Sequence, residues 1–334
     1  MAIDILNITP HEVSKDLCGY TITFYGEPKT GKTTIASKFP KTLLLAFEVG
    51  YLAIPGILAQ PIHSWSEFKK VLKQLKSDEA HEQFSNVVID TADIAYSLCE
   101  KYVCSQKGVD DVADLGFGRG YKAASKEFDE CLRQIPQMGY GLILISHSQD
   151  KVFKDENGDE YNQIVPTLSN QPRLIVDRMS DIIGYAHPVQ DEDGSTHTIL
   201  YMRGTPRFIA GSRFKYTPDY IEFTYDNLVN AISDAIDKQA DENDGKFVTE
   251  TRTTAHNAAD QLDFDALMDT FNELIDKLQN ATGGNFGNTW APRIAEIVGR
   301  HLGKGKLVSD MDRSQAEQLD LIVADLTEAV GNGI

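Results

Sequence analysis

The chain has few cysteines and no long apolar run. Its 334 residues include four cysteines, at positions 18, 99, 104 and 131, and no two of them form a Cys-x-x-Cys pair. We therefore expect buried thiols in a reducing compartment, and neither a disulfide framework nor a zinc site. No run approaches the roughly 20 apolar residues of a membrane-spanning helix, and the amino-terminal stretch "MAIDILNITPHEVSKD" lacks the pattern of a signal peptide. A cytoplasmic protein with no membrane partner is expected.

Basic residues are also scarce. The chain carries 32 Lys and Arg against 50 Asp and Glu, a formal net charge of −18. That balance argues against a protein that coats nucleic acid through its overall field, so any DNA contact must come from local basic patches or from a surface repeated in an oligomer. The hydrophobic content of 41% is ordinary for a globular protein. The length suits one domain of about 230 residues and a smaller one.

The stretch "ITFYGEPKTGKTTIASKFP", residues 22–40, contains G-x-x-x-x-G-K-[ST] between an apolar strand and a helix. The phosphate-binding loop needs this context, which argues against a chance Gly-Lys-Thr in a solvated turn. The predicted cofactors are ATP and Mg²⁺, with Lys32 on the β- and γ-phosphates and the Thr33 hydroxyl on the metal. The predicted nucleotide-binding residues are Gly26, Glu27, Pro28, Lys29, Thr30, Gly31, Lys32, Thr33 and Thr34.

Continuous apolar runs alternate with helical patterns in the first half of the chain. The runs are "YTITFY", "TLLLAFE", "NVVIDT" and "GLILISH". Buried strands separated by helices predict an α/β fold with a mostly parallel sheet covered on both faces. After "DIIGYAHPV" come strands without helices, "HTILYMRG", "RFIAG" and "YIEFTY", which predict an antiparallel extension of the sheet.

The carboxyl-terminal part has a different pattern. A helix, "DNLVNAISDAIDKQ", leads into a polar stretch without periodicity, and three helical patterns follow, beginning with "DFDALMDTFNELIDKLQ". We therefore predict an ATPase core over residues 1–237, a polar linker over 238–262 and a small helical domain over 263–334.

Two of the predicted strands end in carboxylates. Asp90 ends "VVID", where it can hold the Mg²⁺ water shell beside Thr33. Thr91 follows it, whereas many P-loop motors place a water-activating Glu there, so the base must come from elsewhere. Glu48 ends "LLLAFE", and a neighbouring parallel strand would bring it to the same sheet edge. The alternatives are that Asp90 serves a turn, that Glu48 faces solvent, or that Asp93 is the base.

Together the loop, the two carboxylate-ended strands, "GLILISH" and the later hairpin region resemble RecA-type ATPases. "GEPKTGKTT", "VVIDT" and the His after the fourth strand are similar in particular to short phage RecA-like proteins linked to single-strand annealing and recombination. The resemblance covers residues 10 to about 235. It implies that Glu48 activates water and that His147 senses the γ-phosphate, where the recombinases have Gln. The alternative is that His147 is a hydrogen-bonded residue at a strand end.

The resemblance also implies that single-stranded DNA binds to two loops, residues 106–122 and 147–173. Cations and aromatic side chains there would combine phosphate contacts with base stacking. The second loop also contains five acidic residues, which weakens the case for it. The implied DNA-binding residues are Phe117, Arg119 and Lys122 in the first loop, and Lys151, Lys154 and Arg173, with Tyr161, in the second.

Two cations stand two residues apart in "RFIAGSRFKYTPDYIEF". If this stretch is a strand, the side chains of Arg213 and Lys215 leave the same face. RecA-like recombinases carry two cations at this spacing in a hairpin that reaches the γ-phosphate of the neighbouring subunit. The resemblance therefore implies an active site shared within a homo-oligomer, either a ring or a filament. A surface ion pair is the alternative for these cations.

The sequence thus predicts a Mg²⁺-dependent, RecA-like ATPase that acts on single-stranded DNA in recombination or annealing. Its partners would include phage or host replication and recombination proteins, in the bacterial cytoplasm if a phage encodes it. Two other classes stay open. One is a hexameric helicase or translocase, and the other is a nucleotide-switched scaffold with little turnover.

Overall fold

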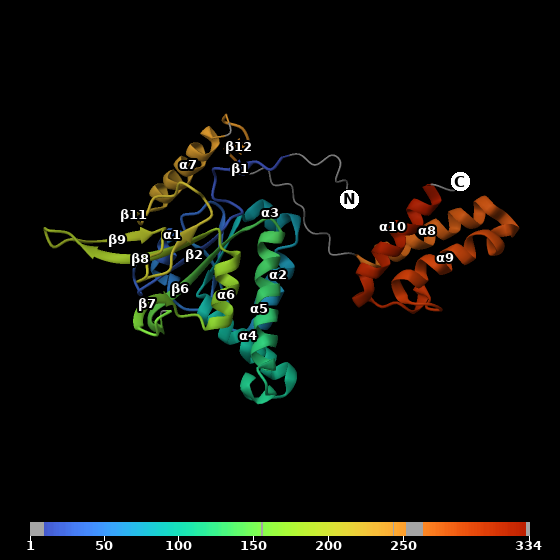
Figure 1. Cartoon of the computed structure of the whole chain (residues 1–334), viewed down its shortest axis with the longest axis horizontal. Coiled ribbons are helices and arrows are strands. Elements are labelled where there is room, and N and C mark those ends of the chain that lie inside the picture. The colour runs from blue at the N-terminus through green and yellow to red at the C-terminus, as the bar shows by residue number, and fades with distance from the viewer. Residues whose placement is uncertain (1–9, 155, 243, 252–262, 332–334) are drawn as a thin grey trace. The chain divides into compact units, whose positions relative to one another are not determined.

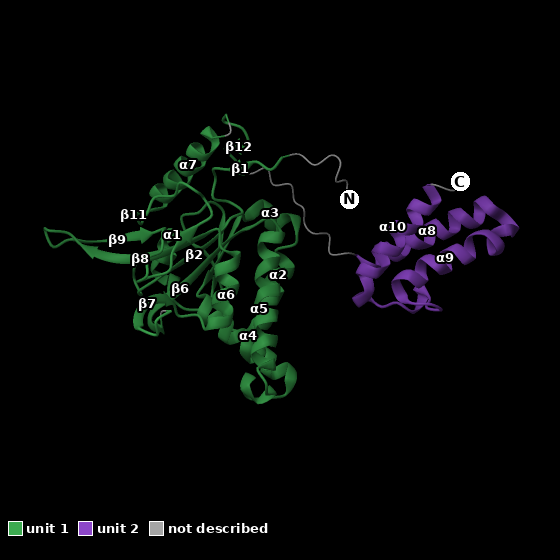
Figure 2. Ribbon diagram, in the orientation of Figure 1, with its two compact units in different colours: residues 1–258 green, residues 259–334 purple. Residues whose placement is uncertain are grey.

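The computed structural model of the chain (Figure 1) describes residues 10–154, 156–242, 244–251 and 263–331. The chain divides into two compact units, residues 1–258 and 259–334 (Figure 2). The first holds the sheet and the phosphate-binding motif, and the second is helical. Among the described residues, no helix is long and apolar enough to cross a membrane.

A mostly parallel sheet forms the centre of the first unit. Six strands lie side by side in parallel, in the order β8-β2-β6-β5-β3-β4, and β9, β10 and β11 extend this sheet as antiparallel strands. This confirms the predicted α/β core with a mostly parallel sheet and an antiparallel extension. The strands are β2 (Thr21–Gly26), β3 (Thr42–Ala46), β4 (Leu58–Pro61), β5 (Asn86–Asp90), β6 (Gly141–Lys154), β8 (Ile182–Gln190), β9 (Thr196–Tyr201), β10 (Gly211–Ser212) and β11 (Tyr220–Glu222).

Helices cover both faces of this sheet because alternate strand residues point to opposite sides. Leu44, Val88 and Ile143 belong to one core cluster, and Leu45 and Ile89 belong to the other. Each such fully buried side chain stabilises the fold by about 1.5–3 kcal/mol. One cluster takes residues from α1 (Lys32–Ala36) and α7 (Tyr225–Asp241). The other takes residues from α2 (Trp65–Gln74), α4 (Ala92–Lys107), α5 (Arg119–Gln137) and α6 (Asn170–Met179), which lie together in Figure 1.

Helix α2 shows why a covering helix forms where it does. The Ser64 hydroxyl caps it by accepting a 3.2 Å hydrogen bond from the amide of Glu67. Trp65, Phe68 and Leu72 recur every three or four residues, so all three are buried on one face. Two short helical elements flank it, η1 (Tyr51–Ala53) before it and α3 (Asp78–Gln83) after it.

Residues 147–173 do not form the predicted loop. Strand β6 continues to Lys154 and pairs antiparallel with β7 (Glu160–Pro166), from Ser148 opposite Pro166 to Lys154 opposite Glu160. The hairpin forms because Val152 and Phe153 continue the strand, and Phe153 stacks on Tyr161 across it at a centroid distance of 5.9 Å. The helix α6 follows, so the segment is ordered into a hairpin and a helix.

The predicted linker begins too early. Helix α7 runs to Asp241, beyond the predicted core end at 237, and β12 (Val248–Thr249) pairs in parallel with β1 (Val13–Ser14). Lys15 forms ion pairs with Asp237 at 2.8 Å and Glu250 at 2.9 Å, which ties both segments to the amino-terminal strand. These contacts place residues 238–242 and 244–251 in the first unit. Residues 252–262 of the predicted linker lie outside the described residues.

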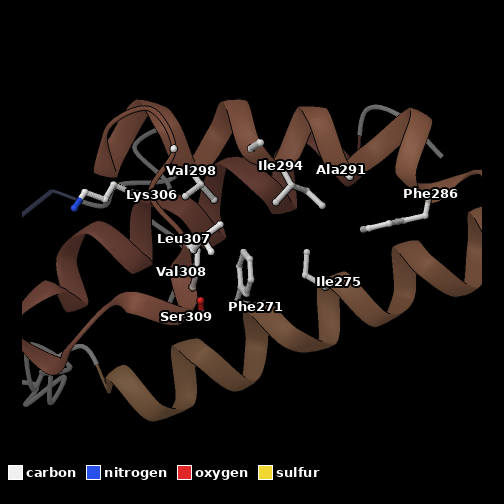
Figure 3. Close-up of a pocket in the computed structure, with 12 residues that line it drawn as sticks. Phe271, Ile275, Phe286, Ala291, Ile294, Val298, Lys306, Leu307, Val308 and Ser309 are labelled. Carbon is white, nitrogen blue, oxygen red and sulfur yellow. The ribbon is translucent and has the colours of Figure 1, made fainter.

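The second unit contains three long helices, as the sequence predicts. They are α8 (Phe264–Thr282), α9 (Phe286–Leu302) and α10 (Ala316–Gly331), with short elements η3 (Gly283–Asn285), η4 (Val308–Asp310) and η5 (Arg313–Gln315). Leu278, Trp290 and Leu319 lie in their shared core. Helix α9 already begins at Phe286, where Phe286 and Trp290 pack inward. A groove of about 410 Å³ lies between α8 and α9 (Figure 3), and Lys306 is the only charged residue that lines it.

Candidate nucleotide-binding site

A cavity of about 340 Å³ lies at the carboxyl ends of the parallel strands. The loop after β2, the segment after β3, the end of β5 and His147 of β6 all reach it. Ligands bind at this edge of α/β sheets because the strand-to-helix loops converge there. The residues that line it are Pro28, Lys29, Gly31, Lys32, Thr33, Thr34, Glu48, Gly50, Ala53, Ile54, Asp90, Ile145 and His147.

The phosphate loop depends on glycine at both of its fixed positions. A Cβ atom at Gly26 would lie 2.2 Å from the carbonyl oxygen of Ala186, so only glycine allows β2 and β8 to pair this closely. Gly31 has a φ of 86° and forms the cap of α1, with no side chain bonded to the free amides of that helix end. Gly31, Lys32, Thr33 and Thr34 line the cavity. The start of α1 therefore faces the space where an anion would sit.

Lys32 is held inside the loop. Its side chain donates hydrogen bonds to the carbonyl oxygens of Gly26 at 3.0 Å and Glu27 at 2.7 Å and to the Thr30 hydroxyl at 3.2 Å. The residue is only 6% exposed, because these bonds fold its side chain back onto the loop. Burial lowers the pKa of Lys32 to about 8, although the nearby Asp90 carboxylate opposes the shift. The loop carbonyls thus hold the ammonium group at the cavity wall.

Thr33 and Asp90, the two residues expected to hold Mg²⁺, are in direct contact. The Thr33 hydroxyl donates a 2.7 Å hydrogen bond to Asp90 Oδ2. Asp90 is 2% exposed, and burial raises its pKa. Its other oxygen, Oδ1, is buried and accepts no hydrogen bond from the described residues. A hydroxyl and a carboxylate with an unused oxygen fit a Mg²⁺ ion, which binds proteins through one or two carboxylates together with substrate phosphates.

Glu48 and His147 meet on the cavity wall. Glu48 Oε2 lies 3.5 Å from His147 Nε2, and each side chain is about one-third exposed. Backbone bonds fix Glu48, because its amide donates to the Asp90 carbonyl oxygen at 3.2 Å. Strand pairing fixes His147, which lies opposite Gly26 in β2. Glu48, Asp90 and His147, which lie far apart in the sequence, thus reach one cavity as predicted.

Asp93 is turned away from this cavity. It lies in the first turn of α4, and its carboxylate accepts hydrogen bonds from the hydroxyls of Ser146 and Thr167 and, at 3.4 Å, from the amide of His147. Glu48 lines the cavity and Asp93 does not. The geometry therefore favours Glu48 over Asp93 as the base.

Known proteins that resemble this chain indicate its family. A family model described as "AAA domain" matches residues 19–214. The chain belongs to the AAA domain family. It is 33% identical over 335 residues to the "SPbeta prophage-derived uncharacterized protein YorG" of Bacillus subtilis (strain 168), with 98% of this chain and 99% of that protein covered. The crystal structure of the flagellar accessory protein FlaH from Methanocaldococcus jannaschii matches at 11% identity, over 62% of this chain and 85% of that one, with a TM-score of 0.33.

This AAA domain is a P-loop ATPase, and its cavity includes residues that the sequence reasoning missed. Gly50, Ala53 and Ile54, around η1, add an apolar wall opposite the phosphate loop. Val49 and Leu52, in the same segment, are 72% and 74% exposed. The stretch after Glu48 has no periodicity in the sequence, so only its position directly after a strand end could have indicated a role.

The two cations after β10 form ion pairs with different acids. Only Gly211–Ser212 is a strand, so the expectation of a strand through Arg213 and Lys215 is wrong, and Phe214 is buried between the two exposed cations. Arg213 pairs with Asp181 at 2.9 Å, and Lys215 pairs with Glu242 at 2.6 Å. These are the surface ion pairs that the sequence left as the alternative. Asp181 also bonds to the backbone of Thr21, at the end of β2 opposite the phosphate loop.

The predicted DNA-binding residues of the AAA domain lie in two places. Phe117 is 100% exposed in the turn between α4 and α5, and Arg119 and Lys122 are exposed in the first turn of α5. The others belong to the β6–β7 hairpin and α6: Lys151, Lys154, Tyr161 and Arg173.

Proposed function

We propose that the chain couples Mg²⁺-dependent ATP hydrolysis to the binding of single-stranded DNA, as a homo-oligomer that acts in phage recombination or strand annealing. One observation carries the proposal. The strand that presents His147 to Glu48 at 3.5 Å continues without a break into a hairpin that carries cations and stacked aromatic rings. The prophage origin of the relative at 33% identity supports the phage setting.

Each residue of the cavity would have a separate role in ATP hydrolysis. Lys32 and the amides at the start of α1 would bind the β- and γ-phosphates, and Thr33 and Asp90 would hold Mg²⁺. When bound, this ion supplies positive charge to the phosphate oxygens. Glu48 would orient a water molecule and take its proton. His147 would hold the Glu48 carboxylate on one side and reach the γ-phosphate on the other.

The hairpin has the chemistry of a single-strand binding surface. Phe153 and Tyr161 stack on each other, and Lys151 and Arg173 lie 5.6 Å and 5.9 Å from the Phe153 ring. Tyr161 is 39% exposed. Aromatic rings bind bases without sequence preference, and the flanking cations bind phosphates. Lys154 is a weaker candidate because it pairs with Glu160 at 3.4 Å.

Exposed apolar side chains support an oligomer. Val49 and Leu52 are exposed in the segment that follows Glu48, which also supplies Gly50, Ala53 and Ile54 to the cavity, and a second copy would cover them. Arg213 lies at the opposite end of β2 from the phosphate loop of its own chain, so only another copy's phosphate would come within its reach. These positions suit a site completed by a neighbouring subunit.

Steady-state hydrolysis with and without an oligo(dT) of about 60 nucleotides tests the proposal, together with mass photometry. We expect hydrolysis that needs Mg²⁺, rises with the oligonucleotide and depends on protein concentration. Hydrolysis that is indifferent to DNA at low salt would refute the coupling. Unwinding of a forked duplex would instead identify a helicase.

A further inference from the structure

We infer that Asp93 is a positioning residue that fixes the orientation of the His147 side chain relative to Glu48. The inference rests on the proposed roles of Glu48 and His147. Asp93 touches neither the cavity nor the phosphate loop, but it holds the backbone of His147. Its effect on hydrolysis would therefore pass entirely through the orientation of the imidazole.

Both oxygens of the Asp93 carboxylate accept hydrogen bonds. Oδ1 accepts from the Ser146 hydroxyl at 2.9 Å and from the Thr167 hydroxyl at 2.5 Å, and Oδ2 accepts from the His147 amide at 3.4 Å. Ser146 is fully buried, so its hydroxyl needs this partner. With three donors directed at it, the carboxylate is committed to the backbone around His147 and is not free to activate water.

These bonds meet at the point where β6 leaves the main sheet. His147 is the last residue of β6 that pairs with β2, and Ser148 is the first that pairs with β7. Thr167 directly follows β7, and its amide donates to the His147 carbonyl oxygen at 2.9 Å. Asp93 therefore binds both strands of the hairpin where they join the sheet. Without it, backbone pairing alone would set the direction in which the His147 side chain leaves β6.

Apart from Glu48, the imidazole ring of His147 has no hydrogen-bond partner among the described residues. His147 Nε2 lies 3.5 Å from Glu48, and Nδ1 is buried with no hydrogen-bond partner among the described residues. Because the ring is held mainly through its backbone, a small change at residue 147 moves Nε2 relative to Glu48. A misplacement of about 1 Å lowers turnover by roughly 10²-fold.

The Asp93→Asn and Asp93→Ala variants should hydrolyse ATP at different rates. In Asp93→Asn, the amide oxygen can still accept from the His147 amide, and the NH₂ group can donate to the two hydroxyls. Those hydroxyls can turn to the His147 carbonyl oxygen, which lies 3.2 Å from Ser146 Oγ and 3.4 Å from Thr167 Oγ1. Asp93→Ala removes every acceptor at once. The asparagine variant should therefore recover most of the turnover that the alanine variant loses.

The test measures kcat, KM for ATP and the melting temperature of the full chain. The variants are D93A, D93N and T167V, with K101A as an exposed control on the same helix. We expect D93A to lower kcat by roughly 10²-fold with KM unchanged, T167V to lower it less, and D93N to lie close to K101A. In an H147A background, D93A should slow hydrolysis little further.

Three outcomes would overturn the inference. If D93N is as slow as D93A, the negative charge of Asp93 matters to the reaction itself. If D93A and T167V melt at a lower temperature but turn over like K101A, the contacts are only structural. If D93A slows the H147A variant by the full factor, Asp93 does not act through His147. E48Q is measured in parallel, and its retention of full activity would count against the proposed base instead.

Discussion

Glu48 Oε2 lies 3.5 Å from His147 Nε2, although Glu48 follows β3 and His147 lies in β6. β5 lies between β3, which precedes Glu48, and β6, which carries His147. The pair therefore spans the strand that ends in Asp90. An acid and an imidazole thus meet in the same cavity that the residues that fit Mg²⁺ also line.

Replacing Lys32 with alanine should abolish ATP hydrolysis. The ammonium group is the only cation that the loop carbonyls hold inside the motif, and no other described side chain occupies its position. Hydrolysis is measured with a coupled assay, and circular dichroism checks the fold. The exposed Lys38 on the same segment is the matched control. Normal turnover by Lys32→Ala would remove the nucleotide assignment.

Replacing Glu48 with glutamine should keep ATP binding and slow hydrolysis by about 10²-fold or more, the usual scale for loss of a general base. The side chain keeps its shape but can no longer take a proton from water. Binding of a fluorescent ATP analogue and single-turnover hydrolysis separate the two effects. Normal hydrolysis by Glu48→Gln, together with slow hydrolysis by Asp93→Asn, would show that Asp93 is the base.

Reversing the charges of Arg119 and Lys122 should weaken single-strand binding and flatten its salt dependence. Each lost phosphate contact lowers the slope of log K against log salt by about one unit. Fluorescence anisotropy with labelled oligo(dT) measures this, and reversal of the exposed Lys70 and Lys73 on α2 is the control. Unchanged binding at low salt would exclude the α5 site.

The hairpin is tested separately with Phe153→Ala. Loss of one stacking ring should weaken oligo(dT) binding by roughly 1–3 kcal/mol at any salt concentration, because stacking involves no counterion release. The same anisotropy titration gives the slope, which should not change. A changed slope with unchanged affinity would contradict a stacking role.

Replacing Arg213 with alanine should stop turnover while each chain still binds ATP, if Arg213 serves a neighbouring site. A cation supplied to the transferred phosphate contributes about 10³-fold or more. Mixing Arg213→Ala with Lys32→Ala chains should then restore part of the activity at interfaces that combine an intact loop with an intact arginine. No restoration in proven mixed oligomers would leave Arg213 as the partner of Asp181 alone.

Thiol labelling tests the burial of the cysteines. Cys99, Cys104 and Cys131 are buried, and burial raises the pKa of each thiol, to about 12 for Cys131. A raised pKa keeps the unreactive thiol form as the pH rises through 8, so a native chain should react only at the partly exposed Cys18. Ellman's reagent should count one thiol in native protein and four in denaturant. Rapid reaction of all four in native protein would contradict the core packing.

Short-range patterns determined most of what the sequence could predict. The phosphate loop is set by glycines and a lysine within eight residues, and Asp90 ends a strand that is apolar throughout. The meeting of Glu48, Asp90 and His147 followed from the rule that parallel strands end at one edge. The sequence could predict that Glu48 and His147 lie at the same edge of the sheet, but it could not predict the distance between their side chains.

The parts that could not be predicted depend on residues far apart in the chain. Whether Arg213 faces outward depends on Asp181, and the orientation of Lys215 depends on Glu242, which lies beyond the predicted core. The β6–β7 hairpin depends on the register between its two strands, and polar residues at its turn conceal the alternation. The burial of Lys32 depends on how its own loop closes, which no spacing reveals.

The continuity of β6 has a mechanical consequence. From His147 to Lys154 the chain advances seven residues along one strand, about 23 Å at roughly 3.3 Å per residue. An unbroken, paired strand resists stretching, so tension applied at the hairpin tip would be delivered along its axis to His147. A force applied at the tip of the hairpin would thus act on the position of the His147 imidazole beside Glu48.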